Sequence, residues 1–209
     1  MDIGYNAFSS CSALKKFQIE NAGNERVGDG LLRMDTAVFQ ECISLEEASF
    51  PSILTKIPDN TFRGCSNLQS VKIPNGVTQI GVQAFEYCVQ LREVDLPTTV
   101  TAIGFHAFFH CESLREIVIP DGVQTIWTRD FSFCKSLKSI VLPVSLTLIE
   151  NFAFYNCHLL HTVYYKGDEA SWNRIRGIYG KGNDRLYTAK KHFNYIPPEK
   201  TQIFSKSLS

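Results

Sequence analysis

Cysteine and histidine are the residues of this 209-residue chain that could form a metal site or supply a nucleophile, and there are seven cysteines and five histidines. The cysteines are separated by one gap of 31 residues and five gaps of 23 residues: Cys11, Cys42, Cys65, Cys88, Cys111, Cys134 and Cys157. Zinc sites use closely spaced motifs such as C-x-x-C or H-E-x-x-H, and neither motif occurs here. The spacing therefore predicts no metal site and no cofactor.

Other combinations that could support catalysis are weak. His110 precedes Cys111 and His158 follows Cys157. Neighbouring side chains of an extended chain point in opposite directions, so we expect no Cys–His dyad. The motif G-x-S-x-G is absent, and Gly180-Lys181-Gly182 is too short for a phosphate-binding loop. The sequence therefore predicts that the protein is not an enzyme.

Charge and hydropathy argue against several kinds of partner. The 21 basic and 21 acidic residues give a formal net charge of zero, which argues against nucleic-acid binding and a polybasic membrane anchor. The sequence has no apolar run long enough to predict a membrane span. It shows no signal peptide and begins inside a repeat, at Ile3-Gly4, so we expect a fragment of a longer protein.

The 23-residue period extends well beyond the cysteines. A phenylalanine lies three residues before every cysteine and a leucine three residues after it, as in Phe85, Cys88 and Leu91. Mostly apolar residues occupy the sixth and eighth positions after each cysteine, and a proline follows in the five middle repeats. Several repeats read I-G-x-x-A-F-x-x-C, as from Ile80 to Cys88. Such a fixed period is typical of a solenoid in which each repeat forms one coil.

Each repeat contains the elements needed to position these residues. The stretch from Leu68 to Ile73 ends in alternating apolar and polar residues, which predicts a short strand that stops at Pro74. The Val77-x-x-Ile80 stretch is expected to be a second extended segment on the opposite wall, and A-F-x-x-C a helical turn that presses phenylalanine inward. Coils stacked about 4.8 Å apart would cover each other's apolar faces.

The phrases L-x-x-V/I-x-I/L-P and I-G-x-x-A-F-x-x-C resemble the BspA-like class of leucine-rich repeats, over about residues 3–165. The resemblance implies an α/β fold: a β-rich leucine-rich-repeat solenoid with a parallel strand ladder, short helical turns and a C-terminal cap. Members are mostly surface or secreted proteins associated with adhesion and protein binding. The resemblance therefore implies a cell-surface or secreted location, and it supplies no catalytic residues.

The cysteine column has two interpretations. An odd number at a strict period favours reduced thiols that fill the core as small apolar side chains. Disulfides between adjacent coils are the alternative, because a spacing near 4.8 Å lies within the Cα range of a disulfide. Parallel side chains would, however, hold the two Cβ atoms somewhat too far apart.

Two places depart from the period. The first gap is eight residues longer than the others (31 minus 23), and its Gly- and Asn-rich surplus near 20–30 predicts an extruded loop. In the coil of Cys134, Trp127 replaces the usual glycine and Asp130 the usual alanine. Trp127 is interpreted either as an exposed aromatic of a binding surface or as a residue that repacks against neighbouring coils.

We expect three parts in the chain: a solenoid of about seven coils in residues 1–165, a C-terminal cap in 166–195 and a flexible tail in 196–209. Residues 168–178 predict an amphipathic helix with Asp168 as its N-cap. Residues 186–195 predict a last strand. The cap would cover the apolar end of the stack.

The outward face of the strand ladder is the candidate binding surface. Its residues form a basic column of Arg92, Arg115 and Lys138 and an apolar stripe of Val118, Val141 and Tyr164. Such a combination is frequent at interfaces. The alternative is an ordinary mixed surface on which valine is simply a good strand former.

The leading functional hypothesis is a non-catalytic protein-interaction or adhesion module that binds a protein through this strand face. A carbohydrate-binding surface module is one alternative, suggested by aromatic residues such as Trp127, Tyr155 and Tyr164. A structural spacer inside a larger surface protein is another, suggested by the start within a repeat.

Overall fold

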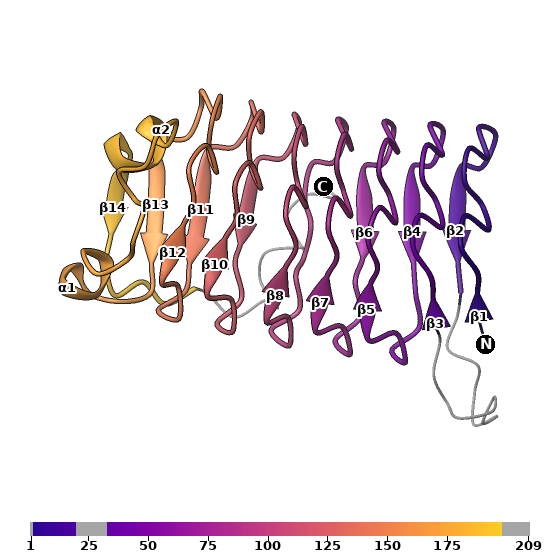
Figure 1. Ribbon diagram of the computed structural model, residues 1–209, viewed down its shortest axis with the longest axis horizontal. Coiled ribbons are helices and arrows are strands. Elements are labelled where there is room, and N and C mark those ends of the chain that lie inside the picture. Colours follow the sequence, from indigo (N-terminus) through magenta and orange to yellow (C-terminus); the bar gives the residue numbers. More distant parts are fainter. Residues whose placement is uncertain (1, 20–32, 198–209) are drawn as a thin grey trace, which may run out of the picture.

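The structure, a computed structural model, describes residues 2–19 and 33–197. The chain winds into an elongated solenoid whose coils stack side by side along one axis (Figure 1). The strands lie on two walls, and turns join the walls at both edges. The loop predicted near 20–30 and nearly all of the tail predicted at 196–209 lie outside the described residues.

The first wall consists of short parallel strands. Their bounds are β2 (Lys16–Gln18), β4 (Glu47–Ser49), β6 (Ser70–Lys72), β9 (Glu116–Val118), β11 (Ser139–Leu142), β13 (Thr162–Tyr165) and β14 (Lys190–His192). Equivalent residues pair in register, Ile117 with Ile140 and Ile140 with Val163, so the predicted parallel ladder is confirmed. Residues 94–96 do not form the expected strand, and the wall divides there into the sheets β2-β4-β6 and β9-β11-β13-β14.

The second wall carries a two-residue strand in each coil. The strands are β1 (Asp2–Ile3), β3 (Arg33–Met34), β5 (Lys56–Ile57), β7 (Gln79–Ile80), β8 (Ala102–Ile103), β10 (Thr125–Ile126) and β12 (Leu148–Ile149). They form the separate sheets β1-β3, β5-β7-β8 and β10-β12, all parallel. The isoleucines of the five later strands point into the core, where each is buried.

The A-F-x-x-C segments form tight turns in place of the helical turns expected. Each has one left-handed residue directly before its cysteine and another four positions earlier, just before the segment, such as His110 (φ 59°) and His106 (φ 61°). A left-handed residue interrupts a right-handed helix, so the amides on these turns can reach the next coil. Phe85 N, for example, donates to Ala107 O at 2.8 Å.

A column of phenylalanine side chains forms the centre of the core, as the periodic pattern predicts. Ring centroids of successive coils are 5.3–5.5 Å apart, along Phe39, Phe62, Phe85, Phe108, Phe131 and Phe154. These six side chains are fully or almost fully buried. Phe8 continues the stack, with its ring 5.4 Å from Phe39, but it is only half-buried.

The cysteine column lies beside the phenylalanines. All seven cysteines are free thiols, and all except Cys11 are buried. Each buried thiol donates a hydrogen bond to a phenylalanine carbonyl, as Cys111 Sγ does to Phe85 O at 3.2 Å. The structure therefore favours the interpretation of the cysteines as reduced core side chains over disulfides between coils.

Thiol titration tests this arrangement. Burial raises the pKa of the Cys134 thiol well above its usual value and that of Cys157 to about 12, so the reactive thiolate is scarce near neutral pH. We expect exposed Cys11 to react rapidly with a maleimide in the native protein, and all seven thiols to react in denaturant without reductant. Fewer than seven reactive thiols in denaturant would indicate disulfides.

The chain beyond β13 packs against the last coil. Helix α1 (Glu169–Trp172) is shorter than the helix predicted over 168–178, but Asp168 does cap it, accepting a hydrogen bond from Ser171 N at 2.8 Å. The helix ends early because the following backbone pairs with β12, where Ile149 N donates to Arg176 O at 2.9 Å.

A second short helix, α2 (Asp184–Thr188), precedes β14, so the strand expected over 186–195 is limited to residues 190–192. Trp172, Ile175, Ile178 and Leu186 are buried in the same hydrophobic core as the coils. This segment therefore covers apolar side chains at the C-terminal end of the stack.

Candidate binding surface

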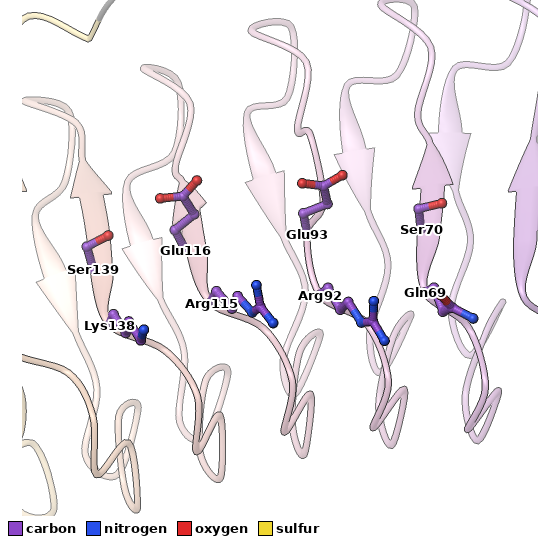
Figure 2. Close-up of a pocket in the computed structure, with 8 residues that line it drawn as sticks. All are labelled: Gln69, Ser70, Arg92, Glu93, Arg115, Glu116, Lys138 and Ser139. Carbon is purple, nitrogen blue, oxygen red and sulfur yellow. The ribbon is translucent and has the colours of Figure 1, made fainter. Parts of the chain in front are cut away.

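An open hollow of about 560 Å³ lies on the first wall, on either side of the coil that lacks a strand. Four successive coils each contribute two adjacent residues to it: Gln69 and Ser70, Arg92 and Glu93, Arg115 and Glu116, and Lys138 and Ser139. Figure 2 shows them in two rows, with Arg92, Arg115 and Lys138 in one row and the two glutamates in the other. The 23-residue period thus brings the predicted basic column together at one site.

The three side chains of the basic column are exposed and form no ion pair with any residue in the described part of the chain. Charges on adjacent coils are paired elsewhere, as in Lys16–Glu47 at 3.1 Å and Lys135–Glu112 at 2.8 Å. Unpaired like charges at a coil spacing of about 4.8 Å repel one another, although water weakens the effect. The hollow therefore offers three cations that an anionic group could neutralise.

The apolar stripe differs from the prediction. Val118 is 40% exposed, but Val141 on the next strand is only 8% exposed, so the expectation that Val141 faces solvent is wrong. Tyr164 is half-buried because the chain from β14 onward folds over it, with the rings of Tyr195 and His192 centred 4.4 Å and 5.1 Å away. The left-handed residue Asn194 (φ 54°) accompanies this reversal of the chain. Of the three residues predicted for the stripe, only Val118 is exposed.

A second hollow of about 410 Å³ lies on the second wall, over β5, β7 and β8. Its apolar rim comes from three successive coils and contains Val82 (37% exposed), Phe105 (41%) and Trp127 (40%). Trp127 is thus an exposed aromatic and has not withdrawn into the core. Val82 and Phe105 were not singled out from the sequence. Each is an apolar residue directly after the glycine of its repeat, and this recurrence in two successive repeats could have pointed to them.

The coil of Trp127 also interrupts the second wall, because β8 and β10 belong to separate sheets. In the two preceding coils the residue at this position is glycine, and its amide donates to the isoleucine of the coil before: Gly81 N to Ile57 O and Gly104 N to Ile80 O, both at 2.8 Å. Trp127 N donates instead to Asp130 Oδ2 at 2.8 Å. The two departures from the repeat are therefore partners in one hydrogen bond.

Asp130 is buried, and burial raises the pKa of its carboxyl well above the usual value, partly offset by the hydrogen bond from Trp127 N. Its Oδ1 has no hydrogen-bond partner among the described residues. A buried carboxyl of this kind is costly in the charged form. Its neighbours Ala107 and Ala153 in the same column carry no such cost.

Glu86 is the second buried acid among the described residues, and both of its carboxylate oxygens have partners. It accepts hydrogen bonds from Arg63 Nε at 2.6 Å and Gln83 Nε2 at 2.9 Å, and His106 Nδ1 lies 3.5 Å away. Burial lowers the pKa of His106. These contacts hold adjacent turns together, and in the described part of the chain no group of three His, Cys, Asp or Glu side chains is arranged to hold a metal ion.

Comparison with known proteins identifies the class. The model of the BspA type leucine rich repeat region matches residues 1–115 and 32–161, with six copies. The protein therefore belongs to the BspA type leucine-rich repeat family. No curated protein sequence matches the chain.

Solved structures agree with this assignment. A leucine-rich repeat protein from Bacteroides ovatus is 32% identical over 78% of this chain and 42% of its own, with a TM-score of 0.65. A leucine-rich repeat protein from T. pallidum is 31% identical over 63% of this chain and 64% of its own, with a TM-score of 0.59. A leucine-rich cell surface protein from Faecalibacterium prausnitzii is 22% identical over 83% of this chain and 65% of its own, with a TM-score of 0.62. The chain thus spans less than two thirds of each of these proteins.

Among the helices of the described residues, none has the length and apolar character needed to cross a bilayer.

Proposed function

We propose that this protein is a non-catalytic protein-interaction or adhesion module that binds its partner through the hollow on the first wall. The observation that carries this proposal is the exposed, unpaired column of Arg92, Arg115 and Lys138 in that hollow. The family supports it, because repeat solenoids expose extended surfaces suited to binding other proteins. Val118 lies at the edge of this surface as an exposed apolar contact.

We also propose a cell-surface or secreted location, which is supported by the description of one structural neighbour as a leucine-rich cell surface protein. For the parts of the chain, we propose a solenoid in residues 1–165 and a cap in 166–195. Burial of Trp172 and Leu186 in the shared core supports the cap.

Site-specific photo-crosslinking tests the proposed binding face. A photoreactive amino acid at Ser70 lies in the hollow, whereas the same amino acid at exposed Thr147 lies beside the second wall. With a surface-protein fraction, we expect discrete protein adducts from position 70 that disappear in the Arg92→Glu/Arg115→Glu variant. Adducts that form equally from position 147, or that survive the charge reversal, would contradict binding at this face.

A second candidate function is carbohydrate binding at the hollow on the second wall. The observation that favours it is the exposed pair of Phe105 and Trp127 on an apolar rim, since aromatic faces offer apolar area next to polar groups. Glycan-array binding that is lost in Trp127→Ala and Phe105→Ala would support this function. An array without binding, or binding that both variants retain, would remove it.

A further inference from the structure

The proposed function does not specify the chemistry of the partner. The charged residues of the hollow on the first wall limit which kinds of partner segment can bind there. Resting on that function, we propose that the partner segment seated in the hollow is an α-helix that carries an acidic stripe beside a basic one. The acidic stripe would lie on Arg92, Arg115 and Lys138, and the basic stripe on Glu93 and Glu116 (Figure 2).

Charge provides the first argument. The five ionic side chains of the hollow form no ion pair within the described part of the chain, and they segregate by sign into two rows. Three positive and two negative charges leave a small positive excess (3 minus 2). A purely anionic ligand would meet repulsion from the glutamate row, whereas a ligand with two adjacent stripes of opposite sign meets complementary charge everywhere.

Spacing provides the second argument. Backbone hydrogen bonds from Arg92 N to Gln69 O (3.3 Å) and from Arg115 N to Arg92 O (3.2 Å) keep these coils adjacent. From Arg92 to Lys138 is two coil spacings, about 9.6 Å at about 4.8 Å each. A helix presents residues i and i+7 on one face about 10.5 Å apart, whereas an extended strand presents i and i+4 about 13 Å apart. A helix that lies along the solenoid axis therefore matches the rows better than a strand.

The surroundings of the hollow also fit a rod-like ligand. Toward the N-terminal coils, uncharged Gln69 continues the basic row and uncharged Ser70 continues the glutamate row. At the other end, Tyr195 folds over Tyr164. Burial raises the pKa of Tyr195, with further contributions from Tyr164 and from the charge of Glu116. The Tyr164–Tyr195 pair thus lies near the C-terminal end of the rows, where it would limit how far a helix can extend.

Fluorescence anisotropy with designed peptides tests this inference on the full chain. The probe is a helix-forming peptide with Glu at i, i+3 or i+4, and i+7 and with Lys on the adjacent stripe. The matched peptide replaces those Glu residues with Gln. We expect the Glu peptide to bind more tightly, and Arg92→Glu/Arg115→Glu to weaken its binding at least tenfold, with weaker binding at high salt.

The matched protein control is Lys15→Glu, which reverses an exposed cation in the same repeat position of the first coil, outside the hollow. This variant should bind the Glu peptide like the unmodified chain, and thermal melts should show that every variant is folded. An equal loss in Lys15→Glu would overturn the inference, because binding would then not depend on where on the first wall the cation lies.

Three further outcomes would also overturn it: equal binding of the Glu and Gln peptides, equal binding of an unstructured poly-glutamate, or Arg-dependent binding of a sulfated polysaccharide without binding of the Glu peptide. The last would make the hollow a glycan site. If crosslinks from position 70 are lost on charge reversal while the Glu peptide fails to bind, the proposed function stands and this inference falls.

Discussion

Phe108→Ala is expected to lower the free energy of unfolding by about 3–5 kcal/mol, the usual cost of replacing a fully buried phenylalanine by alanine. The Phe108 ring has no exposed surface and stacks between Phe85 at 5.3 Å and Phe131 at 5.4 Å. Its loss would leave a cavity between three coils, because the backbones above and below are held by the ladder bonds. Urea unfolding followed by circular dichroism measures the change.

Phe8→Ala is the matched control. Phe8 occupies the same position in the first coil, where its ring stacks on Phe39, meets the tilted ring of Phe17 at 5.3 Å and is only half-buried. Its replacement should cost clearly less than that of Phe108. Equal costs at the two positions would mean that the phenylalanines do not form one continuous column.

The second large effect is expected from Trp127 and Asp130 together. Trp127→Gly/Asp130→Ala restores the residues of the two preceding coils, in which the glycine amide donates to the isoleucine carbonyl of the coil before at 2.8 Å. Asp130→Ala alone removes the hydrogen-bond acceptor of Trp127 N. Trp127→Gly alone leaves the buried carboxyl of Asp130 in place. We expect the free energy of unfolding of the double variant to exceed, by about 0.5–3 kcal/mol, the value obtained by adding the effects of the two single changes.

Glu150 shows why both changes are needed. It occupies the same column, yet its amide still reaches Ile126 O at 2.9 Å, and Ala153 stands where Asp130 would be. A side chain in this column therefore does not by itself abolish the bond. A double-mutant cycle measured by urea unfolding would contradict this explanation if the two effects simply add within about 0.5 kcal/mol.

The periodic part of the fold was predictable because stacking in register converts each sequence column into a row of neighbours. From the second coil onward, the columns of Phe85, Cys88 and Leu91 are buried as expected, and the basic column lines one hollow. The A-F-x-x-C segments were wrongly predicted to be helical turns. Left-handed residues in them, such as Tyr87, His110 and Phe133, are of types from which this backbone conformation could not be predicted.

The errors at the candidate site arise where the chain is not periodic. The segment after β13 has no counterpart in the repeats, so the periodic pattern could not predict that Tyr195 folds over Tyr164. Asp130 was visible as a departure, but its hydrogen bond to Trp127 N depends on the backbone conformation of the turn that joins these two residues within one coil. The absence of a strand at residues 94–96, beside the hollow, likewise leaves no mark in the pattern of residue types.

The claim on which the rest depends is that equivalent side chains of successive coils lie next to one another. A nuclear Overhauser experiment on protein with labelled phenylalanine, with assignments from single Phe→Leu variants, measures this directly. Cross-peaks are expected from the Phe108 ring to both Phe85 and Phe131, whose centroids lie 5.3 Å and 5.4 Å away, but not between Phe85 and Phe131. A Phe108 ring without cross-peaks to either neighbour would contradict the stacked solenoid and every surface row derived from it.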